Sequence, residues 1–347
     1  MQIKENLALA PLTTLGVGGQ ARFFVNAANI EDVESAIAFA TSRKLPLFVL
    51  GGGSNVLISD QGWPGLVLRV GILGIEEEQS RGKASLRVGA GDSWDTFVAL
   101  CVSMNYAGLE CLSGIPGRVG GTPVQNVGAY GQEVSETISS VLAFDRSENR
   151  VRELNNAECG FSYRTSIFNT TDRERYIILR VTYELQPGGA PKLLYADLQK
   201  YFAGYKPPTL SETRNAVLKI RAAKGMLITP GDPDSCSAGS FFKNPVLTVT
   251  EFEDLTRKAE EKGLHLPSYP ALAQQHKVSA AWLVENSGFR KGYSRGRVGI
   301  SSKHALALVN RNQATAAEIV ALKDEIQGRV FATWGIRLEP EPVLVGF

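Results

Sequence analysis

A glycine- and proline-rich stretch between Ser113 and Gly131 constrains this fold more than any other part of the chain. Glycine costs backbone entropy in helices and strands, and proline removes a hydrogen-bond donor, so neither regular structure is expected here. Apolar residues are interleaved throughout and no run of charges interrupts them, which argues against a disordered linker. The stretch therefore predicts an ordered, irregular surface for a large flat ligand, with Gln125 and Asn126 reading ring heteroatoms and Tyr130 packing on a ring.

A second glycine loop follows a predicted strand–helix–strand unit. A strand at 21–25, a helix capped by Asn29 and a wholly apolar strand at 45–50 predict a small parallel α/β layer. The last strand runs into Gly51-Gly52-Gly53-Ser54-Asn55, whose backbone N–H groups can turn to one side and bind a pyrophosphate. The pattern is neither GxGxxG nor GxxxxGK[ST], so it indicates neither a Rossmann fingerprint nor a P-loop, and a tight turn remains an alternative.

Length and composition limit the class of protein. A chain of 347 residues is long for one core, so two or three domains are expected. The net charge of +2 gives no reason to expect nucleic-acid or membrane binding. The four cysteines and three histidines show no zinc-ligand spacing, which predicts no metal site and reduced, partly buried cysteines. The sequence has neither a signal-peptide core nor an apolar run of membrane-spanning length, so a cytoplasmic protein is expected.

Helices are expected on both sides of these loops. One spans 94–104, and its inner face consists of Phe97, Leu100, Cys101 and Met104. In the last third, capping boxes begin two helices and a short helix lies between them; the positions are Thr250 with Glu253, Thr315 with Glu318, and 279–286. Three helices with short strands predict a compact α+β domain at this end of the chain.

The segment Ser237–Pro245 opens the last third and offers a proton donor. Gly239 lets the backbone turn or approach a ligand closely, and Ser240 then presents a hydroxyl from a fixed point. Phe241 and Phe242 follow, and two bulky rings can wedge the loop into a core. A Ser/Gly turn followed by an aromatic strand is the simpler alternative.

Four motifs, in order along the chain, resemble the UDP-N-acetylenolpyruvoylglucosamine reductase family, flavoproteins of bacterial peptidoglycan precursor synthesis. They are Gly51–Asn55, the 113–131 stretch, Ser162-Tyr163-Arg164-Thr165-Ser166-Ile167-Phe168 and Gly239–Pro245, followed by a C-terminal Leu338-Glu339-Pro340-Glu341. The resemblance implies non-covalent FAD, NADPH as the hydride source and reduction of the enolpyruvyl group of a UDP-sugar. It also implies an α+β fold, with a two-part FAD-binding region of the vanillyl-alcohol-oxidase (PCMH) type and an α+β substrate-binding domain.

The resemblance further implies domain boundaries. The first FAD-binding subdomain is expected at 1–72, joined by the C-terminal tail 343–347. The second is expected at 73–222 and the substrate-binding domain at 223–342. The segment Gly225–Ser235 is several residues longer than the family leads us to expect.

The same resemblance implies roles for single residues. Arg164 would stabilise charge that develops on the substrate carboxylate, since a guanidinium is planar and permanently charged. Ser240 would protonate the intermediate with Glu341 as its partner. Glu339 fits equally well on sequence alone, and the family pattern selects Glu341. Pro342 stands where the family usually has valine.

Further contacts are implied for substrate and cofactor. Those to the substrate are Tyr163, Tyr195, which lies in a loop found in one subtype of the family, Lys224, Asn244 and Lys291. Those to FAD are Gly51, Gly52, Gly53, Ser54, Asn55, Ser113, Gly114, Ile115, Pro116, Gly120, Gly121, Gln125, Asn126, Gly128, Ala129 and Tyr130. No metal, nucleic acid or membrane contact is expected, and the protein is expected to act as a monomer on small molecules.

Two alternatives are kept. A flavin oxidase or dehydrogenase of the same fold, acting on a hydroxy acid or an alcohol, would have its flavin reduced by that substrate rather than by NADPH. A non-catalytic nucleotide-binding protein would have a site without an acid or a buried arginine.

Overall fold

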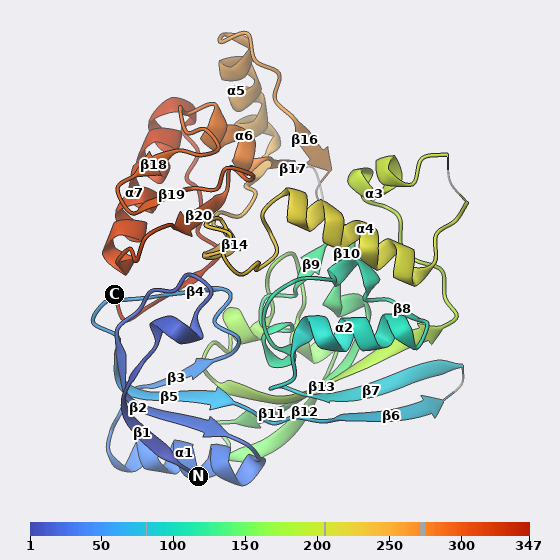
Figure 1. The fold of residues 1–347 in the computed structure, drawn as a ribbon, viewed down its shortest axis with the longest axis vertical. Helices are drawn as coiled ribbons and strands as arrows, with labels where there is room; N and C mark the ends of the chain where they lie inside the picture. Colours follow the sequence, from blue (N-terminus) through green and yellow to red (C-terminus); the bar gives the residue numbers. More distant parts are fainter. Residues whose placement is uncertain (81, 205, 271–274) are drawn as a thin grey trace. The chain divides into compact units, whose positions relative to one another are not determined.

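The computed structural model describes residues 1–80, 82–204, 206–270 and 275–347. Its chain divides into two compact units, which are described separately (Figure 1). Unit 1 consists of Met1–Leu7, Ala21–Gly53 and Pro64–Leu227. Unit 2 consists of Ala8–Gln20, Ser54–Trp63 and Ile228–Phe347. The boundaries expected at 72 and 222, and the place of the 343–347 tail in the first FAD-binding subdomain, stay predictions.

The first sheet of unit 1 contains the predicted strand–helix–strand layer. Its strands, in the order β1-β2-β5-β3, are Ile3–Ala8, Gln20–Ala27, Trp63–Val70 and Leu47–Leu50. Helix α1 (Ile30–Ser42) connects β2 to β3, as predicted, and β3 pairs in parallel with β5, which lies between β2 and β3 in the sheet. The predicted cap is also present, because Oδ1 of Asn29 accepts a hydrogen bond of 2.8 Å from the N–H of Asp32.

The second sheet of unit 1 is antiparallel and larger, and it carries the helices next to the candidate site. In the order β12-β11-β13-β7-β6 its strands are Arg150–Asn155, Ile138–Asp145, Tyr176–Pro187, Lys83–Gly89 and Ile75–Ser80, and β8 (Tyr106–Ala107) pairs with β13. Helix α2 (Trp94–Ser103) lies over one face of this sheet and α4 (Leu210–Ala223) packs against α2 (Figure 1). The rings of Trp94 and Phe97 meet Tyr183 of β13 at centroid distances of 5.9 and 5.2 Å, which fixes α2 on the sheet.

Helix α2 differs in part from its predicted inner face. Phe97 and Cys101 are buried as predicted, whereas Leu100 and Met104 are 38% and 37% exposed. The buried stripe follows positions i, i+3, i+4, i+7 and i+8 from Trp94, so Leu100 lies beside it and Met104 already follows the last helical residue. Burial raises the pKa of the Cys101 thiol to about 12, which suits a packing role.

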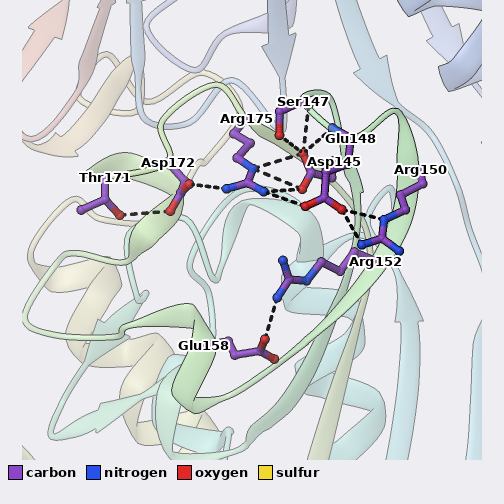
Figure 2. A network of polar contacts seen from close by, with 9 residues as sticks. All are labelled: Asp145, Ser147, Glu148, Arg150, Arg152, Glu158, Thr171, Asp172 and Arg175. Carbon is purple, nitrogen blue, oxygen red and sulfur yellow. Dashed lines mark hydrogen bonds and ion pairs between the residues drawn. The ribbon is translucent and has the colours of Figure 1, made fainter.

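A network of charged side chains joins the β11–β12 hairpin to the start of β13 (Figure 2). Asp145, fully buried at the end of β11, accepts hydrogen bonds from Arg175 at 2.7, 3.1 and 3.2 Å and from the Ser147 hydroxyl at 2.6 Å. Arg175 also reaches Asp172 at 3.0 Å. The hydrogen bonds from Arg175 hold the pKa of Asp145 well below its usual range. The network therefore stabilises the folded state at neutral pH, and this contribution is lost as the pH falls through the lowered pKa.

Unit 2 is built on an antiparallel sheet with the order β14-β20-β19-β18, whose strands are Ser237–Ser240, Ala307–Asn310, Val298–Ile300 and Ser294–Arg295. A smaller sheet has the order β15-β17-β16, with strands Val246–Thr248, Gln275–Val278 and Ser268–Pro270. A parallel pair joins β4 (Val56–Ile58) to β21 (Val343–Val345). Helix α7 (Ala316–Trp334) packs on β19, β20 and α6 (Ala280–Glu285), which matches the α+β arrangement predicted for the last third (Figure 1).

Two of the three helices that the sequence predicts for the last third begin where they are expected. Thr315 and Glu318 form the capping box of α7, and Ser279 caps α6. The predicted start of α5 (Val249–Glu260) at Thr250 is wrong, since Thr248 forms the capping box with Glu251. Both threonines precede a glutamate by three residues, and the helix starts at Thr248 because β15 ends there. Across the residues that the structure describes, no helix combines the length and the apolar character needed to cross a bilayer.

Candidate active site

The two predicted glycine loops approach each other within unit 1. A Cβ atom on Gly52 would lie 2.6 Å from Cα of Gly117 and 3.1 Å from N of Arg118, so only glycine allows this approach. At Gly51 and Gly121, by contrast, no described atom lies within 4 Å of where a Cβ would stand. Tight backbone contact thus occurs beside open space on both loops.

The 113–131 stretch is ordered by contacts to the helices around it. The N–H of Gly114 donates to Oδ1 of Asp95 at 2.6 Å, and Arg214 of α4 donates to both oxygens of the same carboxylate at 2.7 and 2.9 Å. The N–H of Gly120 donates to the carbonyl of Ala90 at 3.0 Å. A carboxylate held by a bidentate arginine is a rigid anchor, which agrees with the predicted ordered surface.

The end of this stretch forms a tight hairpin between β9 (Gly128–Ala129) and β10 (Gln132–Glu133). Tyr130 and Gly131 occupy its turn with φ of +50° and +83°, the combination of a two-residue hairpin turn. The Tyr130 ring is buried and meets the edge of the Tyr195 ring at 5.3 Å. Tyr130 therefore packs on a protein ring, and the predicted contact with a cofactor ring stays a prediction.

Asn126 is 1% exposed and its side-chain amide is held by the protein. Its nitrogen donates to Oε2 of Glu133 at 2.8 Å and to the carbonyl of Ser162 at 3.0 Å. Its oxygen accepts from the N–H of Ser135 at 3.1 Å. Both N–H groups of the amide are thereby engaged, and reading of ring atoms by Asn126 stays a prediction. Its neighbour Gln125 is half-buried.

Arg164 stands in a two-residue turn in unit 1. Ser162 and Thr165 close the turn with reciprocal backbone hydrogen bonds of 3.0 and 3.1 Å, and Arg164 has a φ of +57°. Its guanidinium carbon lies 5.6 Å from the centroid of the Tyr163 ring. A Cβ on Gly128 would lie 3.2 Å from Nη1 of Arg164, so the hairpin backbone passes close to the guanidinium.

Two of the predicted substrate contacts come together near Tyr130. Tyr195 precedes α3 (Ala196–Tyr201), is 42% exposed, and Lys224 follows the last residue of α4. Nζ of Lys224 lies 2.5 Å from Oδ2 of Asp197 and 5.9 Å from the centroids of both tyrosine rings. Burial lowers the pKa of Lys224, but the hydrogen bond to Asp197 and the attraction of nearby groups, Asp197 first among them, together outweigh burial, so that this pKa is raised. The lysine is thus protonated at neutral pH and suited to an anionic ligand.

Unit 2 contains the predicted proton donor at the end of β14. A register shift in the pairing with β20 lies between Ser237 and Ser240, and Gly239 there has a φ of +72°. Phe241 and Phe242 are buried in the unit's core, as predicted for rings that wedge the loop. The irregular strand thus holds Ser240 next to a rigid aromatic anchor.

Backbone pairing in unit 2 distinguishes the two candidate glutamates. The N–H of Glu341 donates to the carbonyl of Phe241 at 2.8 Å, which places Glu341 beside the residue after Ser240. The N–H of Lys243 donates to the carbonyl of Glu339 at 2.9 Å. The Glu339 side chain is 75% exposed and forms a 3.5 Å ion pair with Lys243, whereas Glu341 is half-buried.

Pro342 fits the backbone around Glu341 without a lost hydrogen bond. The N–H of Glu341 is used by Phe241, and the N–H of Val343 donates to the carbonyl of Asn55 at 3.0 Å. The Asn55 side chain donates to the Glu341 carbonyl at 3.3 Å. Proline between these two donors has no N–H to satisfy, so the departure from the family's valine leaves this pairing intact.

The remaining predicted substrate contacts, Asn244 and Lys291, belong to unit 2. Oδ1 of Asn244 accepts from the N–H of Ala280 at 2.9 Å at the start of α6. Lys291 is exposed. The first glycine loop is itself divided, because Gly51–Gly53 belong to unit 1 and Ser54 and Asn55 to unit 2.

Comparisons with known proteins cover the whole chain. Residues 232–345 match the model of the UDP-N-acetylenolpyruvoylglucosamine reductase C-terminal domain, and residues 21–153 match an FAD binding domain. The UDP-N-acetylenolpyruvoylglucosamine reductase of Thermobifida fusca is 45% identical over 99% of this chain and 98% of its own length. The chain belongs to the UDP-N-acetylenolpyruvoylglucosamine reductase family. The corresponding protein of Streptomyces coelicolor is 44% identical over 100% of this chain and 91% of its own.

A solved structure agrees with this family assignment. The crystal structure of the reductase from Thermus caldophilus has a TM-score of 0.66 and 25% identity, and covers 99% of this chain and 98% of its own. Together with the FAD binding domain match, it confirms the predicted fold class. Membership of the reductase family makes the chain an FAD-dependent oxidoreductase of peptidoglycan precursor synthesis and disfavours the oxidase and the non-catalytic alternatives.

Sequence reasoning missed two carboxylates that hold the candidate site together. Asp95 anchors Gly114, and no motif marks it. Glu110 is completely buried and accepts hydrogen bonds from the Gln132 amide at 2.7 Å and from the N–H of Lys192 at 2.9 Å. Glu110 thereby ties the segment before Tyr195 to the β9–β10 hairpin. The burial of this glutamate cannot be predicted from the sequence, because burial depends on residues distant in the chain.

Proposed function

We propose that this chain reduces the enolpyruvyl group of UDP-N-acetylglucosamine enolpyruvate to give UDP-N-acetylmuramate, with Arg164, Ser240 and Glu341 as its catalytic residues. The observation that carries the proposal is the backbone hydrogen bond from Glu341 to Phe241, which brings the half-buried residue Glu341 beside the residue that follows Ser240. Hydride addition to the terminal vinyl carbon leaves negative charge on the adjoining carbon and its carboxylate. That carbon then requires a proton and the charge requires a cation.

Each catalytic residue answers one of these requirements. Arg164 binds the substrate carboxylate through its guanidinium and stabilises the developing charge. Ser240 donates the proton. Glu341 interacts with the Ser240 hydroxyl and lowers the free energy of forming its alkoxide. The exposed Glu339 is unsuited to that role because its ion pair with Lys243 lies in solvent.

The cofactor contacts proposed for FAD are the two glycine loops, Gly51–Asn55 and Ser113–Tyr130. The open space beside Gly51 and Gly121 fits a ligand that lies against backbone, and glycine N–H groups suit its pyrophosphate. When bound, FAD supplies the hydride that it has received from NADPH. Tyr163, Tyr195, Lys224, Asn244 and Lys291 are proposed to hold the UDP-sugar, with the diphosphate competing with Asp197 for Lys224. The protein is proposed to act as a cytoplasmic monomer.

The two half-reactions test the function directly. The purified protein is expected to be yellow, to be bleached by NADPH in the absence of oxygen, and to recover its colour when the enolpyruvyl UDP-sugar is added. Stopped-flow absorption at the flavin band measures both steps. Bleaching by a hydroxy acid or alcohol instead of NADPH, or no recovery of colour with the enolpyruvyl substrate, would contradict the proposal.

Replacement of the open glycine tests the pyrophosphate contact. Gly51→Asp is expected to abolish flavin retention while leaving the melting temperature of the FAD-free protein unchanged, since a Cβ there meets no described atom and only the added carboxylate repels phosphate. Gly51→Ala is the matched control and keeps its FAD. Gly52→Ala lowers the melting temperature because its Cβ would stand 2.6 Å from Gly117. Full FAD occupancy in purified Gly51→Asp would refute the contact.

A further inference from the structure

Arg164 has a left-handed backbone conformation, which neighbouring residues must stabilise. A φ of +57° is sparsely populated by residues other than glycine, and such a conformation persists only where the surrounding structure holds it. Two backbone hydrogen bonds close the turn from Ser162 to Thr165, but they fix its shape and not its position in the protein. The position of the guanidinium therefore depends on side chains that fasten the turn to its neighbours.

Asn126 fastens one side of the turn. Its amide nitrogen donates to the carbonyl of Ser162, the first residue of the turn, and to the carboxylate of Glu133 in the β9–β10 hairpin. Its amide oxygen holds the N–H of Ser135 just after that hairpin. One fully buried amide thus connects the Arg164 turn to two points of the hairpin segment.

The hairpin also limits the space available to the Arg164 guanidinium. A Cβ on Gly128 would stand 2.8 Å from Cγ of Glu133, 3.0 Å from the carbonyl oxygen of Gln132 and 3.2 Å from Nη1 of Arg164. No methyl group fits there without displacing Glu133 or Arg164. Glu133 is therefore placed by two contacts, the Asn126 amide and the Gly128 backbone.

Asn169 fastens the opposite side of the turn. Its amide nitrogen donates to the carbonyl of Arg164 at 3.2 Å, and its oxygen accepts from the N–H of Ser166 at 2.9 Å. The Ser166 hydroxyl donates in turn to the carbonyl of Val124 at 2.6 Å. Val124 lies two residues before Asn126, so both fastenings lead back to the same glycine-rich stretch.

We propose that Asn126 and Gly128 are positioning residues for Arg164, which set where its guanidinium meets the substrate carboxylate. This inference rests on the proposed function of Arg164 and goes beyond it, because it gives part of the glycine-rich stretch a task in the substrate half-reaction. A shift of about 1 Å in a charged catalytic group can cost on the order of 10²-fold in rate. The Asn126 amide contacts the Arg164 turn and the Gly128 backbone passes close to the guanidinium, so a change at either position can cause such a shift.

Asn126→Asp is the first test, since aspartate keeps the shape of asparagine but removes both N–H donors and adds a charge beside Glu133. In the FAD-loaded enzyme, reoxidation by the enolpyruvyl substrate is expected to slow by roughly 10–100-fold, and by a larger factor than flavin reduction by NADPH. Affinity for UDP-N-acetylmuramate, measured by calorimetry, falls in the same variant. Gly128→Ala is expected to show the same selective slowing of reoxidation. This variant tests the proposal if Asn126→Asp does not fold.

Asn156→Asp is the matched control. Its amide nitrogen also joins backbone carbonyls of this region, Ser135 at 2.9 Å and Ile138 at 2.8 Å, but no hydrogen bond described for it reaches the Arg164 turn. A loss of melting temperature with normal reoxidation is expected. Equal slowing of reoxidation in Asn156→Asp and Asn126→Asp would overturn the proposal, because general loosening of the unit would then explain both.

A double-mutant cycle separates this inference from the function on which it rests. If Asn126 acts through Arg164, Asn126→Asp slows reoxidation no further in an Arg164→Ala background. Fully additive slowing would overturn the inference while leaving the role of Arg164 intact. If Arg164→Ala alone leaves reoxidation unchanged, the proposed function of Arg164 fails instead.

Discussion

Ser240→Ala is expected to retain FAD, to bind the enolpyruvyl substrate and to be bleached by NADPH at the wild-type rate, yet to turn over about 10²–10⁴-fold more slowly. The loss follows because the intermediate left by hydride addition then lacks its proton donor. Ser240→Cys is expected to recover part of the rate, since a thiol also donates a proton. Single-turnover reoxidation of the pre-reduced enzyme measures the effect in all three proteins.

A serine in a connection between two strands of the same sheet provides the control for this experiment. The Ser301 hydroxyl accepts a hydrogen bond from the N–H of Lys303 at 3.1 Å in the connection between β19 and β20. Ser301→Ala is expected to lower stability and keep its reoxidation rate. Reoxidation of Ser240→Ala near the wild-type rate would remove Ser240 from the mechanism and leave Glu341 or a bound water as the acid.

Arg164→Ala is expected to separate the two half-reactions. Flavin reduction by NADPH stays close to wild type, whereas reoxidation by the enolpyruvyl substrate slows by roughly 10²–10³-fold, the usual cost of removing one group that stabilises developing negative charge. Arg152→Ala serves as the control, because that arginine pairs with Glu158 on the surface of unit 1. Equal slowing of both half-reactions would show that Arg164 serves the fold or the flavin.

The sequence determined the features that depend on neighbours along the chain. The Asn29 cap of α1 and the Thr315–Glu318 capping box of α7 are local hydrogen-bonding signals, and the structure contains both. The glycine-rich stretch and the motif around Ser240 also identified the family, because such close backbone approaches permit few alternative residues.

In some places two residues showed the same local pattern, and tertiary contacts decided which of them has the predicted role. Thr248 and Thr250 have the same spacing to a glutamate, and the end of β15 selected Thr248. Leu100 fits an apolar stripe on α2, and the position of the second sheet left it exposed. Glu339 and Glu341 differ by two residues, and strand pairing with Phe241 and Lys243 separated them.

The tertiary structure alone decided how the candidate site is held. Asn126 meets Ser162 only because the hairpin segment and a distant turn fold against each other, and Asp95 meets Gly114 only because α2 lies beside the glycine stretch. Hydrogen bonds of this kind join residues far apart in sequence, so no local pattern encodes them. Residue types thus determined the chemistry available to this chain, whereas burial and long-range pairing decided where each group stands.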